Sequence, residues 1–205
     1  PSVKKSHNVD ELTAYAMLYP VSPATRALPT TVLSPVLNAE KIDGTNACII
    51  IQEGTLPEDL TTINRLWVNN KLYSIWAQSR TRLITPEDDN FGFAKWVKDN
   101  AEQLINDLGE GYHYGEWWGQ GINRGYGLDH KRFSLFNPTK HSDICYHVPH
   151  MVTVENYREL QDWINVECER LVEEGSLASP GYMRPEGLVV YAEKAKTYWK
   201  VIIAK

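Results

Sequence analysis

Residues 40–46 read Glu-Lys-Ile-Asp-Gly-Thr-Asn, and the interpretation of the chain starts from this stretch. Strand-like residues flank it, with Val36 and Leu37 before it and Ala-Cys-Ile-Ile-Ile at 47–51 after it. An Asp-Gly pair between two such runs predicts a tight turn or a hairpin, because glycine adopts positive φ without steric cost. That turn would hold the Lys41 amine at the end of a strand. The simplest alternative is a hairpin that only reverses the chain and leaves Lys41 in solvent.

The composition predicts a globular protein. Of the 205 residues, 42% are hydrophobic and 23% are charged, so we expect one packed domain over residues 1–205, with no C-terminal accessory domain present. No apolar run approaches the roughly 20 residues that cross a bilayer, and no membrane partner is expected. The three cysteines, Cys48, Cys145 and Cys168, form no Cys-x-x-Cys pair. They read as reduced thiols, which favours the cytoplasm, or the host cytoplasm if a phage encodes the protein.

The charge balance argues against one class of function. With a net charge of −5 and a pI near 5.7, the chain does not resemble a basic protein that coats nucleic acid without specificity. Such a protein needs a dense surface of Lys and Arg to neutralise phosphates. A local basic groove is compatible with this balance, because basic residues cluster at 65–82 and at 124–132.

Strand and helix patterns alternate irregularly along the chain. Apolar residues recur at helical spacing in residues 10–19, 93–108 and 156–174, and Thr-Pro-Glu-Asp at 85–88 predicts the start of the second helix. Strand-like runs are expected at 66–68, 72–77, 112–118, 132–136, 144–154, 187–192 and 197–203. Because these elements follow no regular βαβ order, the sequence predicts an α+β fold with mainly antiparallel sheets flanked by helices.

Four later segments carry charged residues in strand contexts. Arg80 follows a strand, and a guanidinium donates a fork of hydrogen bonds that suits phosphate. Glu116 lies in the apolar stretch Tyr-Gly-Glu-Trp-Trp-Gly, where a carboxylate must face a pocket or find donors. Glu186 precedes an apolar strand, and Lys200 lies in the last strand. Taken singly, each residue also fits an ordinary solvated or ion-paired position.

The string Glu-Lys-x-Asp-Gly-Thr-Asn resembles the nucleotidyl-acceptor motif of the covalent nucleotidyltransferases. This superfamily comprises ATP-dependent DNA ligases, RNA ligases and mRNA capping enzymes, and the ending Gly-Thr-Asn is most similar to the RNA ligases that seal nicked RNA. The resemblance implies the nucleotidyltransferase (ATP-grasp-like ligase adenylation) fold and makes Lys41 the catalytic nucleophile. It also implies ATP and Mg²⁺ (or Mn²⁺) as cofactors, and RNA with 5′-phosphate and 3′-hydroxyl ends as the partner.

The reaction that the resemblance implies has three steps. The lysine attacks ATP to form lysyl-AMP, AMP passes to a 5′-phosphate, and a 3′-hydroxyl then displaces AMP to seal the strand. An ordinary lysine, with a pKa near 10.4, is protonated at neutral pH and is not a nucleophile. Burial or neighbouring positive charge frees its lone pair.

The resemblance assigns nucleotide-binding roles to three later segments. Arg80 would lie near the ribose and phosphates, with Arg82 as a second candidate. Glu116 would accept hydrogen bonds from the ribose hydroxyls. Phe136 would stack on the purine, because a flat ring binds a base with little loss of rotamer freedom, and Phe133 is the fallback.

The remaining candidate residues lie at the two ends of the chain. Lys200 would contact the α-phosphate, although the Lys-x-Lys pattern of many family members is broken two residues later. Glu40 would contact the adenine edge, and Asn46 completes the cofactor-binding set. Asp43 and Glu186 would hold the metal ion.

Several alternatives stay open from the sequence. The chain could be a DNA ligase, a GTP-using capping guanylyltransferase or a non-catalytic nucleotide-binding domain. A metal cluster could also be drawn from His141, Cys145, His147 and His150, but its spacing matches no standard zinc pattern.

Overall fold

The computed structural model describes residues 2–4, 36–54, 62–137, 139–148, 150–154, 157–192 and 197–203. The chain forms two compact units, which we call unit 1 (Pro1–Asp43 and Val148–Lys205) and unit 2 (Gly44–His147). The helix expected at residues 10–19 lies outside the described residues. The expectation of a single domain over residues 1–205 stays a prediction.

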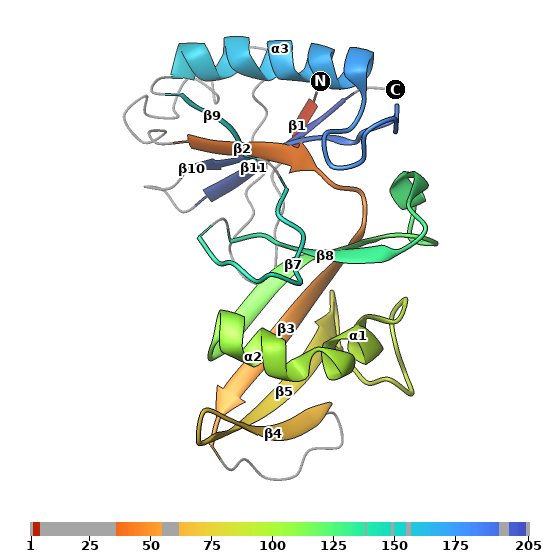
Figure 1. Cartoon of the computed structure of the whole chain (residues 1–205). Coiled ribbons are helices and arrows are strands. Elements are labelled where there is room, and N and C mark those ends of the chain that lie inside the picture. Colours follow the sequence, from red (N-terminus) through yellow and green to blue (C-terminus); the bar gives the residue numbers. More distant parts are fainter. Residues whose placement is uncertain are drawn as a thin grey trace. The chain divides into compact units, whose positions relative to one another are not determined.

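Unit 1 contains a five-stranded antiparallel sheet, called sheet 1, and one long helix (Figure 1). The strand order is β1 (Ser2–Lys4), β11 (Thr197–Ile202), β10 (Gly187–Ala192), β2 (Val36–Lys41) and β9 (His150–Val154). The helix α3 (Tyr157–Glu174) runs along one face of this sheet (Figure 1). The core of unit 1 lies between helix and sheet, where buried residues of α3 meet buried residues of β10 and β11, namely Leu160, Ile164, Leu171, Leu188, Val190, Trp199 and Val201.

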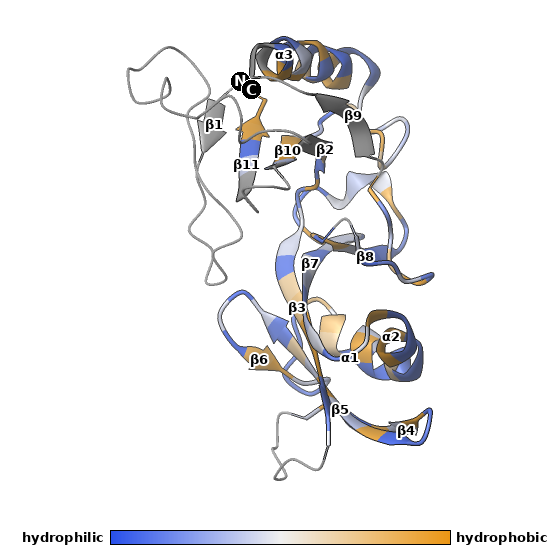
Figure 2. Ribbon diagram, turned by 90° about the vertical axis from the view of Figure 1, so that its left-hand side faces the viewer, coloured by the Kyte–Doolittle hydropathy of each residue, from blue (hydrophilic) through white to orange (hydrophobic). Residues whose placement is uncertain are grey.

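Unit 2 contains a second antiparallel sheet, called sheet 2, with two short helices on one face (Figure 1). Its order is β4 (Asn64–Val68), β5 (Lys71–Ser79), β3 (Thr45–Glu53), β7 (Gly111–Gly119) and β8 (Lys131–Leu135), and β6 (Leu83–Ile84) pairs with β5. The helices are α1 (Phe93–Asp99) and α2 (Ala101–Leu108), and a 3₁₀ turn, η2, covers Gly125–Gly127. Both α-helices carry hydrophobic and hydrophilic residues side by side (Figure 2), as helices that cover a sheet do.

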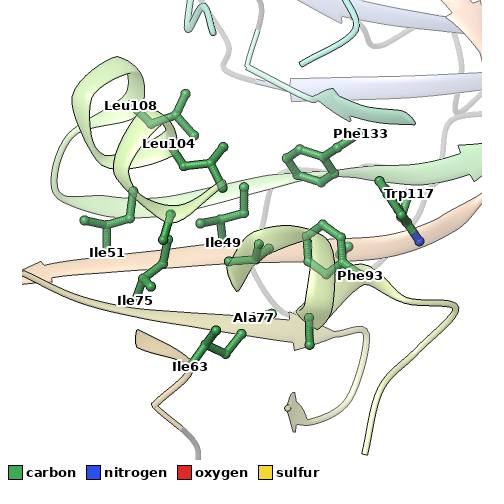
Figure 3. Close-up of a cluster of buried hydrophobic side chains, with 14 of the residues drawn as sticks. Ile49, Ile51, Ile63, Ile75, Ala77, Phe93, Leu104, Leu108, Trp117 and Phe133 are labelled. Atoms are coloured by element: carbon green, nitrogen blue, oxygen red, sulfur yellow. The ribbon is translucent and has the colours of Figure 1, made fainter. Parts of the chain in front are cut away.

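The core of unit 2 fills the space between these helices and sheet 2 (Figure 3). Alternate residues of the central strands point into it, because successive strand side chains face opposite sides. Phe93 lies at its centre, fully buried, with its ring 5.1 Å from that of Phe133 and 5.4 Å from that of Trp117. Other large members come from β3, β5 and α2, among them Ile49, Ile51, Ile75, Leu104 and Leu108.

The α+β class and the antiparallel sheets are confirmed, but the predicted hairpin at Asp43-Gly44 is wrong. The strands on either side of the motif do not pair with each other, since β2 belongs to sheet 1 and β3 to sheet 2. Strand β2 pairs instead with β10 and β9, and β3 pairs with β5 and β7. The alternative in which Asp-Gly merely closes a hairpin therefore does not hold.

Two element boundaries also differ from the sequence patterns. The second helix begins at Phe93, not near residue 85, because Thr85 and Asp88 close a turn and the Asp89 carboxylate accepts hydrogen bonds from the Ala94 and Lys95 amides. This helix is also divided at Asn100, whose side-chain amide donates to the Trp96 carbonyl. Within the strand expected at 144–154, the described residues form only β9, which begins at His150. In the described part of the chain, no helix is long and apolar enough to cross a bilayer.

Replacing Phe93 by alanine should destabilise unit 2 strongly. The substitution leaves a cavity beneath three aromatic rings, and such changes cost about 3–5 kcal/mol in the free energy of unfolding. Trp67→Ala is the matched control, because Trp67 is 70% exposed and its removal should change stability by only about 0.5 kcal/mol. Urea unfolding followed by circular dichroism measures both, and equal losses would contradict this account of the core.

Candidate active site

The pairing of β2 with β10 brings together the two strongest sequence motifs. Lys41, the last residue of β2, lies opposite Gly187, the first residue of β10. Glu186 precedes that glycine, and its carboxylate forms an ion pair with the Lys41 amine. The two side chains are 15% and 22% exposed, so the pair is partly shielded from water. A lysine and a carboxylate 145 residues apart in the sequence therefore meet at one strand end.

Lys200 lies on the same face of sheet 1 as Lys41. In the strand register, Val189 of β10 pairs with Ala39 on one side and with Lys200 on the other. Because strand side chains alternate, positions 39 and 41 share a face, and Lys200 shares it through Val189. This is the face opposite α3. Asp43 follows β2 by two residues and is half-buried in the same unit.

Glu40 points to the other face of sheet 1, toward α3. It is only 2% exposed, and its Oε2 atom accepts hydrogen bonds from the Ser176 hydroxyl (3.0 Å), the Leu177 amide (2.7 Å) and the Ala178 amide (3.0 Å). Its Oε1 atom is buried and has no hydrogen-bond partner among the residues that the structure describes. Burial raises the pKa of this carboxyl above 4.5, although these hydrogen bonds lower it. The structure thus engages Glu40 with the turn after α3 and does not bring it together with Lys41.

Three candidate residues of unit 2 share the face of sheet 2 that lies opposite the core. Asn46 of β3 pairs with Glu116 of β7. The Phe136 amide donates to the Tyr114 carbonyl, which continues the β7–β8 register and puts Phe136 on the same face as positions 114 and 116. Phe133, the fallback for base stacking, faces the other way into the core (Figure 3).

The two arginine candidates after β5 differ in their surroundings. Arg80 is exposed and directly follows Ser79, which pairs with Ala47 beside Asn46. Arg82 donates two hydrogen bonds to the Asp88 carboxylate, at 2.5 and 2.9 Å. Arg82 is therefore part of a local ion pair, whereas no ion pair of Arg80 is found among the described residues.

Glycine at position 44 is required by close approach and not by positive φ. A Cβ atom there would lie 2.5 Å from the Trp117 carbonyl oxygen and 2.8 Å from Trp118 Cβ. The Gly44 amide donates to Glu116 Oε1 at 3.0 Å, and its carbonyl accepts from the Asn123 side-chain amide at 2.6 Å. The sequence patterns did not identify Asn123 as a residue that contacts the motif. Its only signal was an asparagine in the glycine-rich segment 119–127.

The two residues expected to hold a metal ion, Asp43 and Glu186, both belong to unit 1, and Glu186 contacts Lys41. Among the residues that the structure describes, no group of three or more His, Cys, Asp or Glu side chains could hold a metal ion. A Mg²⁺ site needs no such group, because this ion takes one or two carboxylates together with substrate phosphates. For the alternative His–Cys cluster, burial raises the pKa of the Cys145 thiol to about 11 and so disfavours the thiolate that metals bind.

Comparison with known proteins identifies the family. The model of the RNA ligase family matches residues 34–203, which include every candidate residue described above. The chain belongs to the RNA ligase family. No curated protein matches it significantly in sequence.

Solved RNA ligases share the fold of the chain. A mutant RNA ligase from Naegleria gruberi in the apo state is 16% identical, and the match covers 83% of this chain and 50% of that chain with a TM-score of 0.54. A second mutant of the N. gruberi RNA ligase, solved with AMP and Mn, is 15% identical over 84% of this chain and 50% of that chain, also with a TM-score of 0.54. The chain therefore spans about half the length of these ligases.

Glu40 should make unit 1 lose stability as the pH rises. A carboxyl whose pKa is raised on folding stabilises the fold fully below its unfolded value, near 4.5, and this contribution is lost as the pH rises through the folded value. Glu40→Gln should weaken this loss, because the neutral amide does not ionise. Urea unfolding between pH 4 and pH 8 measures the difference. Glu102→Gln, an exposed control, should follow the wild type, and identical slopes for all three proteins would contradict the assignment.

Adding a methyl group at position 44 should disturb the motif. Gly44→Ala places Cβ against the rigid Trp117 carbonyl, and such overpacking costs about 1–3 kcal/mol. Gly121→Ala is a control with nothing within 4 Å of its Cβ, although its φ of +73° costs about 1 kcal/mol. Unfolding free energies compare the two. The account fails if Gly44→Ala is as stable as the wild type.

Proposed function

We propose that this chain is the adenylation part of an ATP-dependent RNA ligase, in which Lys41 becomes covalently linked to AMP. The observation that carries the proposal is the contact between Lys41 and Glu186, in a chain of the RNA ligase family. A solvated surface lysine is protonated at neutral pH and is not a nucleophile, whereas Lys41 is partly buried at a strand end that two distant motifs share. Activity, substrate and partners of the whole protein belong to this proposal, because the chain spans half the length of the ligases it resembles.

In the first step the Lys41 nitrogen attacks the α-phosphorus of ATP. A nitrogen–phosphorus bond forms, the bond to the bridging oxygen breaks, and pyrophosphate leaves with the electron pair. The amine must lose a proton to attack, and Glu186 is the carboxylate in contact with it. Lys200, on the same face of sheet 1, would stabilise negative charge on the α-phosphate.

A divalent cation, Mg²⁺ or Mn²⁺, would neutralise charge on the phosphates when bound, and Asp43 and Glu186 would be its protein ligands. Their hard oxygens suit such an ion. The resemblance to a ligase solved with AMP and Mn supports ATP and a divalent cation as the cofactors.

The nucleoside would lie on the face of sheet 2 opposite the core. Phe136 would stack on the adenine and Glu116 would accept hydrogen bonds from the ribose, with Asn46 beside it and Arg80 near the ribose and phosphates. The shared face of the first three residues supports this arrangement. The adenine-edge role of Glu40 remains a prediction without support from its position.

AMP would then pass from Lys41 to the 5′-phosphate of an RNA end. The nitrogen–phosphorus bond breaks, a phosphoanhydride forms, and a neighbouring 3′-hydroxyl attacks the 5′-phosphorus with release of AMP. RNA with 5′-phosphate and 3′-hydroxyl ends is the proposed partner, and the cytoplasm is the proposed location.

Incubation with α-labelled ATP and Mg²⁺ tests the covalent step. We expect acid-resistant label on the wild-type protein and none on Lys41→Ala or Lys41→Arg, because neither variant offers the amine. Lys71→Ala is the matched control: Lys71 is 55% exposed, pairs with Glu53, and should be labelled like the wild type. Label that survives in both Lys41 variants would remove this residue from its role.

Competing nucleotides and strands separate the rival enzymes. A DNA ligase would be labelled by ATP but would seal nicked DNA in preference to nicked RNA, and a guanylyltransferase would be labelled by GTP. The proposal requires labelling by ATP and sealing of RNA. A protein with no label under any of these conditions would be a non-catalytic nucleotide-binding domain.

A further inference from the structure

We propose that Arg132 is a phosphate-binding residue, which holds a phosphoryl group at the end of sheet 2 next to Gly44. The ligand is either the triphosphate of ATP or the 5′-phosphate of RNA. This inference rests on the proposed function, because it uses the expected positions of the base and the ribose.

Two aromatic rings and one histidine fix the guanidinium of Arg132. Its central carbon lies 4.6 Å from the centre of the Tyr146 ring and 5.7 Å from that of Trp118. These two rings meet edge to face at 5.3 Å, and Arg132 Nε donates to His130 Nε2 at 2.8 Å. The charged group is therefore held in a defined place instead of moving freely in solvent.

No carboxylate in the described part of the chain forms an ion pair with Arg132. The neighbouring acid, Asp129, accepts from His130 at 2.7 Å. After its Nε–H bond to His130, Arg132 has four N–H groups on its two terminal nitrogens, and no described residue accepts from them. A half-buried, stacked guanidinium with unused donors is suited to an external anion, and its planar fork matches phosphate oxygens.

The strand register puts Arg132 at the phosphate end of the proposed nucleotide site. Along the face of sheet 2 opposite the core, the row with Phe136 would take the base, and the next row, with Glu116, would take the ribose. The third row, about 7 Å further along the strand, pairs Trp118 with Arg132. Trp118 also approaches Gly44 closely. The third row thus lies beside Gly44, on the side of the ribose row away from the base, where the phosphates would lie.

A purely structural role is the alternative. Arg132 could serve only to cover Trp118 through cation–π contact. A lysine at position 132 distinguishes the two roles. Lysine keeps a positive charge that can bind phosphate, but it lacks the planar fork of donors and the flat surface that stacks on Trp118.

Variants Arg132→Gln and Arg132→Lys test the proposal in two reaction arms. The first arm measures single-turnover labelling of Lys41 as a function of ATP concentration. The second follows AMP transfer from labelled protein to 5′-phosphorylated RNA. Arg65→Gln, exposed on the edge strand β4, is the matched control. All proteins are first compared by urea unfolding, so that any loss is referred to the folded fraction.

We expect Arg132→Gln to lose about 10- to 100-fold in one arm or both, the range for a lost charge-assisted hydrogen bond, and Arg132→Lys to lose less. A raised ATP requirement identifies the triphosphate as the ligand, and a loss confined to transfer identifies the 5′-phosphate. Unchanged rates in both arms overturn the proposal. The proposal is also overturned if Arg132→Gln and Arg132→Lys lose the same activity and this loss equals the decrease in their folded fractions.

A third measurement separates failure of this inference from failure of the proposed function. In the Lys41→Ala background, fluorescence anisotropy compares the binding of RNA with a 5′-phosphate and with a 5′-hydroxyl, and the binding of ATP. Should the wild type acquire no label, the proposed function fails. Arg132 is still supported if Arg132→Gln abolishes a preference for the 5′-phosphate or weakens ATP binding, and overturned if neither changes.

Discussion

The antiparallel pairing of β2 with β10 is the constraint on which the proposed chemistry depends. It joins two segments that lie almost at opposite ends of the chain, and it sets the lysine of one against the carboxylate of the other. The register has no freedom to slip. Leu188 and Val190 of β10 are fully buried under α3, and Glu40 of β2 is buried on the same face. If β10 slipped by one residue against β2, the buried residues of one of the two strands would turn to the opposite face. The hydrophobic side of sheet 1 therefore fixes the chemistry on its other side.

Local patterns were sufficient to predict many elements of this fold. The last two strands and the long helix were predicted to within about one residue, because 187–192 is a short continuous apolar run and apolar residues recur at helical spacing in 157–174. The break at Asn100 and the late start of α1 depend on side-chain hydrogen bonds to the backbone. Such bonds form only once the turns exist, and a periodic pattern does not reveal them.

The residues of the candidate site could be predicted only where they belong to a recognisable sequence motif. The resemblance selected Lys41 and Glu186, and the structure brings them into contact, but no local rule could have paired strands so far apart in the sequence. Asp-Gly was interpreted as a hairpin because its flanks are strand-like, yet the flanking strands enter different sheets. Glu40 shows the same limit. Its place beside the lysine suggested a ligand contact, whereas alternation along the strand turns its carboxylate away.

The division of the chain has a consequence for the order in which the protein folds during synthesis. Unit 2 is one continuous segment, while unit 1 is built from residues on both sides of it. On the ribosome, unit 2 can fold as soon as it has emerged. Strand β2 is synthesised earlier, but it cannot pair with β10 until β10 has been synthesised. The first residue of β10 lies 146 residues after the last residue of β2. At translation rates of about 5–20 residues per second, β2 has no β10 partner for roughly 7–30 s. In the nascent chain, unit 2 therefore forms before the nucleophile meets its carboxylate.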